Sequence, residues 1–316
     1  MKFKLTIFFI LFIFLSCQKD QSTFIPDQTF LINSDLLLAN FVNNPNSYLV
    51  TLNEGKTIIT DHDKFVLEIP FESLTDSLGN FVKGEIKVEF KDFTQQKSDL
   101  IKSPSTIYNS NLLDCKKIIY LNISQGGKSL QIIKEIGMYL KSEFVVDSTR
   151  LYIFKFDEGE SKWYTENTTN FDVNVGNWSI NDKESNIQVF GYKVPILQNG
   201  GWFSIAGILP GNYESEKEIN IISSPYINGK NTLTFFIANK SNTTFRLFSN
   251  KVNHDFSAHF NISDEIIPGK IIMISQFGDN NFQFGISNML LGLDTELRLV
   301  SEEKSLEEIK AILKSL

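Results

Sequence analysis

Apolar and polar residues alternate over short stretches along most of this chain, which is the period of a β-strand with one buried face. The stretch at residues 86–90 shows the pattern well, because Ile86, Val88 and Phe90 alternate with charged residues. Similar stretches recur at short spacing, without helical patterns between them. The hydrophobic pattern therefore predicts antiparallel β-structure over most of the chain.

Turn-forming residues separate the predicted strands in the first two thirds of the chain. Asp, Asn and Gly tolerate the dihedral angles of turns, and proline cannot donate to a β-ladder. The strands predicted here are residues 48–52, 57–60, 65–69, 86–90, 117–124, 130–133, 138–145, 151–156, 190–197 and 202–208. The region 167–186 is poor in apolar residues, and it predicts either a long loop or an edge hairpin.

The last third of the chain repeats the strand pattern after a polar run at residues 213–218, which predicts a linker. The strands predicted there are residues 220–222, 233–238, 245–248, 256–262, 270–276, 282–286 and 296–300. Short strands at this spacing, with Asn-Gly, Ser-Asn, Pro-Gly and Gly-Asp turns between them, are typical of a small β-sandwich.

An amphipathic helix is predicted at the end of the sequence. Ser305 and Glu308 have the spacing of a capping box, in which each side chain accepts a hydrogen bond from the backbone of the other residue. The apolar residues that follow lie on one helical face: Leu306, Ile309, Ile312, Leu313 and Leu316. So short a helix is marginally stable alone, and we expect it to dock on a sheet or on a partner. The apolar patch at residues 36–42 predicts either a short strand or a short helix.

These patterns together predict a mainly β fold, with two antiparallel β-sandwich-like domains and a short C-terminal amphipathic helix. The predicted divisions are a signal peptide at residues 1–16, a tether at 17–46, a first β-sandwich domain at 47–212, a second β domain at 213–300 and the helix at 301–316.

The N-terminal residues have the pattern of an export signal. Lys2 and Lys4 precede an apolar run at residues 5–15, which ends at Ser16 and Cys17. A run of this length is too short to cross a hydrocarbon core, which needs about 20 residues, and it fits the apolar part of a signal peptide, about 7 to 15 residues. The alternatives are an ordinary secretory signal followed by a coincidental cysteine, and an uncleaved anchor.

The end of this run resembles a bacterial lipobox. Leu15 and Ser16 precede Cys17 as in that motif, although Phe14 stands where the common pattern has leucine. The resemblance implies that the mature protein begins at Cys17 and that this cysteine is acylated. Several acyl chains on one residue hold a protein firmly to a membrane.

The next residues are similar to the lipoprotein export signal of Bacteroidota. In that signal a lysine and an acidic residue follow shortly after the acylated cysteine, and here the residues are Gln18, Lys19 and Asp20. The resemblance implies that the protein is lipid-anchored at the outer membrane and faces the cell exterior.

A second resemblance lies in the strands and turns of the first predicted domain. Ile69-Pro70 ends one strand, a D-x-x-G turn begins at Asp76, and a V-x-G-x-I-x-V strand begins at Val82. This order is similar to a segment of many uncharacterised Bacteroidota surface lipoproteins, and it also resembles ZU5-like β-sandwich modules. In the family pattern a Cys and an Asp follow a Gly-Trp pair, but here Phe-Ser-Ile-Ala follows Trp202. The resemblance implies a fold and no particular chemistry.

The composition limits the classes of partner. The formal net charge is −7, and it becomes −9 without residues 1–16, because both charges in that segment are lysines. An acidic chain with scattered lysines argues against nucleic acid as a partner. With 42% hydrophobic residues, including 28 Phe, the chain has ample material for a core, which excludes the disordered class.

Residues that commonly carry catalysis or bind metals are few and scattered. With Cys17 acylated, Cys115 has no disulfide partner, and we expect it to be a small buried hydrophobe. His62 lies in a polar turn, while His254 and His259 are five residues apart and would face opposite sides of a strand. The sequence therefore predicts no catalytic residue, no metal site and no cofactor.

Some residues are candidates for ligand contact or modification. Trp163 and Trp178 could offer flat rings for stacking on a sugar, whereas Trp202, in an apolar strand, is expected in the core. Ser77 and Ser148 each follow an aspartate, in a pattern that resembles the O-glycosylation sites of exported Bacteroidota proteins.

From the sequence we expect an outer-membrane surface lipoprotein that acts as a non-catalytic interaction or scaffold module, with the membrane and an outer-membrane protein as its partners. The alternative is a glycan- or nutrient-binding accessory protein of an outer-membrane uptake system, and a hydrolase ranks third. A sugar-binding protein predicts an exposed aromatic cluster, whereas a hydrolase predicts histidines or carboxylates that converge in a concave site.

Overall fold

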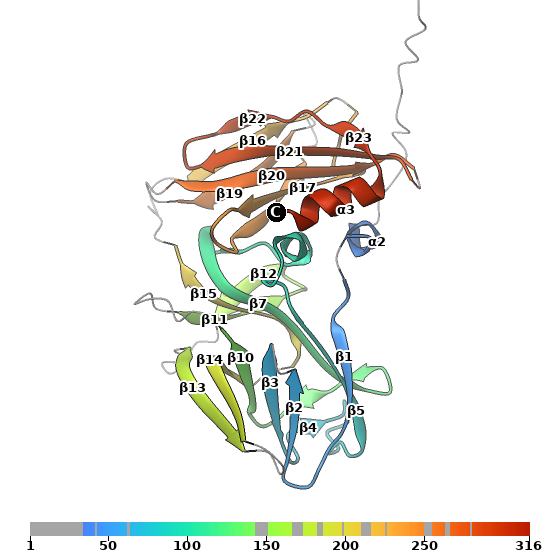
Figure 1. Cartoon of the computed structure of the whole chain (residues 1–316), viewed down its shortest axis with the longest axis vertical. Coiled ribbons are helices and arrows are strands. Elements are labelled where there is room, and N and C mark those ends of the chain that lie inside the picture. The colour runs from blue at the N-terminus through green and yellow to red at the C-terminus, as the bar shows by residue number, and fades with distance from the viewer. Residues whose placement is uncertain are drawn as a thin grey trace, which may run out of the picture.

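The computed structural model describes residues 34–41, 43–61, 64–142, 151–165, 173–181, 186–197, 199–209, 216–224, 226–249, 255–262, 266–278 and 280–316 (Figure 1). The fold is mainly β, which confirms the predicted class. No helix among these residues is long and apolar enough to span a bilayer.

The strands up to residue 208 form two sheets that face each other and one two-stranded ladder, in which β4 pairs with β9. They are β1 (Asn46–Thr51), β2 (Lys56–Asp61), β3 (Phe65–Pro70), β4 (Leu74–Thr75), β5 (Glu85–Asp92), β6 (Ile107–Tyr108), β7 (Asn111–Gln125), β8 (Lys128–Ser129), β9 (Gln131–Ile132), β10 (Ile136–Lys141), β11 (Tyr152–Asp157), β12 (Lys162–Thr165), β13 (Asn174–Asn181), β14 (Asn186–Ile196) and β15 (Gly201–Ile208). One sheet has the order β13-β14-β10-β3-β2, and the other contains β1, β5, β7, β15, β11 and β12.

The core between these two sheets, called the sandwich core here, follows directly from the alternation in the sequence. Ile86, Val88 and Phe90 of β5 are all buried in it, while the intervening charged residues face away. From the opposite sheet Phe65 stacks on Phe90 with ring centroids 3.9 Å apart. The alternation of apolar and charged residues therefore correctly predicted both the strand and which of its faces is buried.

The remaining strands extend the sheet of β7 through its contact with β19, and they curl back on themselves. They are β16 (Glu216–Ile222), β17 (Thr232–Ala238), β18 (Thr244–Ser249), β19 (Phe256–Asn261), β20 (Ile267–Gln276), β21 (Phe282–Leu291), β22 (Glu296–Arg298) and β23 (Glu302–Lys304). Alternate residues of β16 to β21 meet in one cluster, called the distal core, in which Phe236, Phe245 and Phe260 lie with neighbouring centroids 5.0 and 5.3 Å apart. A sheet whose strands all send side chains into one cluster must fold over that cluster.

A third cluster, the junction core, lies between the two halves. The helices that contribute to it are α2 (Ser34–Ala39), the 3₁₀ helix η1 (Lys97–Lys102) and α3 (Leu306–Lys314), and they lie against the outer face of β17, β20 and β21 (Figure 1). Ile309 and Leu313 of α3 are buried there beside Phe235 and Phe284. The ammonium group of Lys97 also connects η1 to this sheet, because it donates hydrogen bonds to the main-chain oxygens of Ala238 and Ser241, where β17 turns towards β18.

Strand β7 runs through all three cores. Leu112 at its start is buried in the distal core, Ile118 in the junction core and Leu121 in the sandwich core. The predicted division after residue 212 therefore separates two segments that share a core, and the division itself stays a prediction.

The C-terminal helix has the predicted cap. The backbone N–H of Glu308 donates to Ser305 Oγ at 3.3 Å, and the backbone N–H of Ser305 donates to Glu308 Oε2 at 2.8 Å. Ile309 and Leu313 on the predicted apolar face are buried, so the helix docks on the sheet of its own chain.

Other local expectations are settled as follows. Helix α2 covers residues 36–39 of the patch predicted at 36–42, and the region 167–186 contains β13, which pairs with β14 as an edge hairpin. The predicted linker at 213–218 is partly strand, because β16 begins at Glu216. Two strand contacts are parallel, which the antiparallel prediction did not include: β16 with β22, and a single residue pair between β7 and β19.

Candidate functional site

A hollow of about 500 Å³ opens where β5, β7 and β15 meet the end of η1. Its floor is made by Phe93, Tyr120 and Trp202, and its rim by residues 44, 45 and 47 and by three charged side chains of β5 and η1. Pockets that take small molecules commonly have volumes of about 300 to 1,000 Å³. We call this site the aromatic hollow.

The register of two neighbouring strands produces the aromatic floor. Trp202 of β15 lies directly opposite Tyr120 of β7, so both rings project from the same face of the sheet, with centroids 5.4 Å apart. The ring centroid of Phe93, which follows β5, lies 4.5 Å from that of Trp202. Phe93 is fully buried, whereas Trp202 and Tyr120 are half-buried and contribute accessible ring surface.

Two of the charged groups at the rim bind each other. Lys87 Nζ lies 2.6 Å from Glu89 Oε1, and Asn122 donates to the other oxygen of Glu89 at 2.9 Å. The hydrogen bond from Lys87, followed by the one from Asn122, lowers the pKa of Glu89 below its usual value. Glu89 is therefore an ionised acceptor with both of its oxygens engaged.

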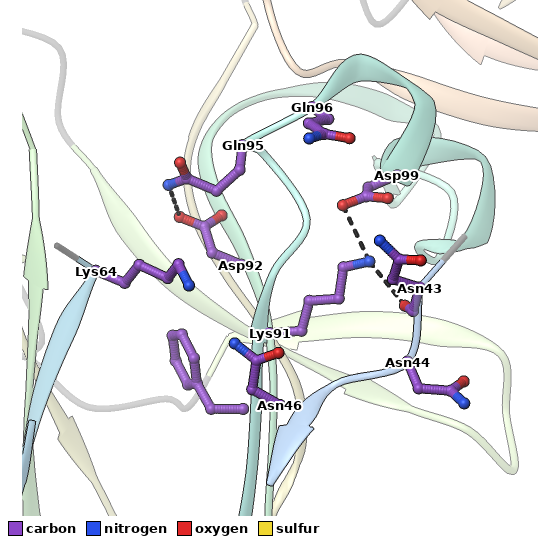
Figure 2. Close-up of a pocket in the computed structure, with 10 residues that line it drawn as sticks. Asn43, Asn44, Asn46, Lys64, Lys91, Asp92, Gln95, Gln96 and Asp99 are labelled. Carbon is purple, nitrogen blue, oxygen red and sulfur yellow. Dashed lines mark hydrogen bonds and ion pairs between the residues drawn. The ribbon is translucent and has the colours of Figure 1, made fainter. Parts of the chain in front are cut away.

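A buried ion pair lies behind the floor. Lys91 Nζ is 3.0 Å from Asp99 and donates to the main-chain oxygen of Asn43 at 2.8 Å (Figure 2). It also lies 4.8 Å from the centre of the Phe93 ring. Burial lowers the pKa of Lys91, and the charge of Lys102 acts in the same direction. This pair fixes the segment that enters β1 against the end of β5.

A smaller cavity of about 150 Å³ lies on the other side of this ion pair. Figure 2 shows its lining, which is rich in amides and is reached by Lys64, Lys91, Asp92 and Asp99. The two cavities share Asn44 in their walls.

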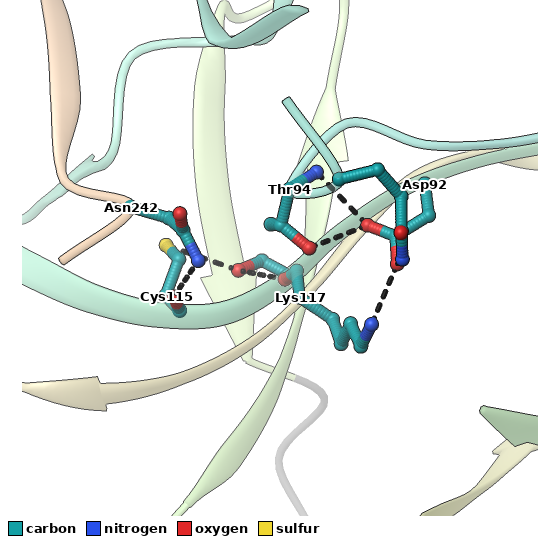
Figure 3. Close-up of polar contacts among 7 residues, drawn as sticks. Asp92, Thr94, Cys115, Lys117 and Asn242 are labelled. Carbon is teal, nitrogen blue, oxygen red and sulfur yellow. Dashed lines mark hydrogen bonds and ion pairs between the residues drawn. The ribbon is translucent and has the colours of Figure 1, made fainter. Parts of the chain in front are cut away.

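Asp92 in the smaller cavity is fully engaged. It accepts from the backbone and hydroxyl of Thr94 at 2.9 and 2.6 Å, from Gln95 at 2.9 Å and from the ammonium of Lys117 at 2.7 Å (Figure 3). This carboxylate holds the turn after β5 against β7, and its oxygens are occupied by the protein itself.

Cys115 is confirmed as a buried residue. It is 1% exposed, and burial raises the pKa of its thiol to about 12. Ser204 Oγ lies 3.2 Å from its sulfur, and Asn242 donates to its main-chain oxygen at 2.9 Å (Figure 3). An uncharged, enclosed thiol is not a nucleophile.

The two tryptophans proposed from the sequence lie in separate clusters. Trp163 is 2% exposed in the junction core and donates from Nε1 to the main-chain oxygen of Ser105 at 2.7 Å, so its ring has no free face for a ligand. Trp178 is half-buried on the outer face of the other sheet, 6.1 Å from Tyr139, with Lys193 over its ring. The two do not form one platform.

The aromatic cluster instead contains Trp202, which the sequence analysis assigned to the core. An outward-facing aromatic in β7 could be inferred from the alternation of Tyr120, Asn122 and Ser124. The partner of Tyr120 depends on the register with β15, which lies about 80 residues away and has no local signal.

The remaining candidate residues are placed as follows. Ser77 is exposed in a turn where Asp76 accepts from the backbone of Leu78 at 2.8 Å and of Asn80 at 2.9 Å. His259 is exposed, and its Nε2 lies 3.5 Å from Glu218. Residues that lie outside the described parts of the chain are Cys17, Gln18, Lys19, Asp20, His62, Ser148 and His254. Within the described ranges, no group of three or more His, Cys, Asp or Glu residues is placed to hold a metal ion.

No protein-family model matches the sequence, and no curated protein is significantly similar to it.

Proposed function

We propose that this protein is a lipid-anchored protein of the outer cell surface that acts as a non-catalytic interaction module. The aromatic hollow carries the binding part of this proposal. Its volume suits a small ligand or a protruding group of a larger partner, and the half-buried rings of Trp202 and Tyr120 offer contact surface that is already in place. A pre-formed site reduces the entropy that binding must overcome.

The charged groups around the hollow support binding without catalysis. Glu89 is held by Lys87 and Asn122, and its lowered pKa keeps it ionised at neutral pH, so it is suited to accept hydrogen bonds and unsuited to donate a proton. A carboxyl group that acts as a general acid needs a pKa raised to near the working pH, and an apolar environment raises it in this way. The pKa of Glu89 is shifted in the opposite direction.

The lipid anchor is supported by the sequence pattern around Cys17. The charged start, the length of the apolar run and the small residue before the cysteine resemble a lipobox, and Lys19 and Asp20 resemble an export signal. These features support a folded part that lies outside the outer membrane, and an outer-membrane protein is then the partner that we propose.

Three measurements on the full-length chain test this function. Labelled palmitate should enter the wild-type protein but not the Cys17→Ala variant, and the protein should be accessible to an impermeant reagent on intact cells. A pull-down from intact outer membranes, with the acyl anchor kept, should recover a partner that Trp202→Ala fails to retain. Equal palmitate incorporation into both chains overturns the anchor, and equal recovery by both overturns the role of the hollow.

A second candidate is a glycan- or nutrient-binding accessory protein of an outer-membrane uptake system. The floor of the hollow favours it, because the C–H face of a sugar ring packs on an aromatic face, and two such faces lie 5.4 Å apart here. A titration of the chain with sugars, followed by tryptophan fluorescence, tests this candidate. The signal change should depend on Trp202 and not on Trp178, and dependence on Trp178 alone would refute it.

A further inference from the structure

One cation at the aromatic hollow has no partner to offset its charge. Lys102, the last residue of η1, lines the hollow and is half-buried, and among the described residues its ammonium makes no ion pair or hydrogen bond. The other charges at the site are matched, because Lys87 binds Glu89 and Lys91 binds Asp99. The hollow thus carries one uncompensated positive charge.

This charge stands in an acidic protein. The formal net charge of the chain is −7, so the molecule as a whole repels anions, whereas the hollow attracts them at short range. The attraction acts within the Debye length, about 8 Å at physiological salt. Lys102 also bears on its neighbour Lys91, since its charge contributes to the lowered pKa of that residue. An anionic group bound at Lys102 would relieve this repulsion.

The rest of the lining suits a hydroxylated ligand with an apolar face. Trp202 and Tyr120 present ring surface, while Ser47 and Asn44 are exposed at the rim and supply a hydroxyl and an amide for hydrogen bonds. Each carboxylate oxygen of Glu89 already accepts one hydrogen bond, from Lys87 or Asn122, and can accept a second one from a ligand. A pyranose ring combines these properties, because its C–H bonds form an apolar face and its hydroxyls both donate and accept.

We propose that the aromatic hollow binds a saccharide that carries a carboxylate, with the sugar ring on Trp202 and Tyr120 and the carboxylate at Lys102. The inference rests on the proposed binding function of the hollow and names its ligand class. Neutral saccharides and acids without a sugar ring are the competing ligands, and the experiment separates them.

The test uses the folded chain on an array of neutral glycans beside their uronate-bearing counterparts, with free glucuronate and benzoate as soluble competitors. Wild-type protein should bind uronate-bearing glycans, and glucuronate should compete more strongly than benzoate. Lys102→Gln should weaken that binding about tenfold, which is the effect of losing one hydrogen bond to a charged group. Lys230→Gln is the matched control, because it removes the same charge from an exposed turn of the other half of the molecule.

The outcomes separate this inference from the proposed function. Equal binding of neutral and uronate-bearing glycans, or unchanged uronate binding in Lys102→Gln, overturns the carboxylate preference and leaves the hollow as a glycan site. Stronger competition by benzoate than by glucuronate overturns the saccharide. Binding to no glycan, together with a partner pull-down that still depends on Trp202, overturns the saccharide ligand and leaves the interaction function standing.

Discussion

The ion pair between Asp92 and Lys117 gives a quantitative test of how the turn after β5 is held to β7. The two charged atoms lie 2.7 Å apart, and the side chains are 4% and 10% exposed. At an effective dielectric constant of about 20, Coulomb's law gives about 6 kcal/mol of gross attraction at this distance. The desolvation of Lys117 offsets part of it.

Replacing Lys117 by methionine keeps most of the side-chain volume and removes the charge. Asp92 then stays buried with Thr94 and Gln95 as its remaining donors. Breaking a buried pair commonly costs about 3 to 5 kcal/mol, and these remaining donors favour the lower end. We therefore expect Lys117→Met to reduce the free energy of unfolding by about 3 kcal/mol.

The assay is urea unfolding of both single variants and of the double variant Asp92→Asn, Lys117→Met, followed by tryptophan fluorescence and circular dichroism. Removing both charges leaves neither partner buried alone, so the double variant should lose about 2 kcal/mol less than the sum of the single variants. A loss below about 1 kcal/mol in Lys117→Met, or additive losses, would refute the view that this pair is coupled and buried.

Three further predictions concern the helix, the thiol and the acid limb of stability. Leu313→Ala should lower the free energy of unfolding by about 2 to 4 kcal/mol in a urea titration, because Leu313 is 1% exposed in the junction core, whereas Lys314→Ala at an exposed position of the same helix should change it little. Cys115 should resist iodoacetamide in the native state and react after unfolding, since burial raises its pKa to about 12, and rapid native labelling would contradict this. The lowered pKa of Glu89 stabilises the fold above its unfolded value, near 4.5, and this contribution is lost as the pH falls through the folded pKa. Glu89→Gln should therefore show a weaker loss of stability with acid, and an unchanged pH profile would count against the prediction.

The sequence predicted an element of this fold well where neighbouring residues alone determine its local geometry. The alternation in β5 gave both a strand and its buried face, and the Ser305–Glu308 spacing gave the cap of the last helix. Helix η1 was missed, because six residues are too few to show a helical period. Its buried residues gain their stability from contacts with segments far along the chain.

The candidate site depends on register, which local sequence does not encode. Trp163 was a candidate for stacking on a ligand, but the pairing of β12 with β11 turns its ring into the junction core. Trp202 lies in an apolar strand and was expected in the core, and its ring does pack against the junction core. It stays half-buried, however, and so it also lines the hollow opposite Tyr120. The chemistry of each indole could be predicted from the sequence, but its exposure depends on the strands that pack around it: the neighbouring strand β11 for Trp163, and the distant strand β7 for Trp202.

The course of β7 limits how this architecture could be reused. One continuous strand supplies side chains to three cores, so neither half of the molecule contains all the pieces that its own interior requires. Recombination that moved one half into another protein would expose apolar core residues to solvent in the transferred half and in the half left behind. A lineage that carries this arrangement is expected to transmit it whole, and to diversify by changing the loops and the lining of the hollow.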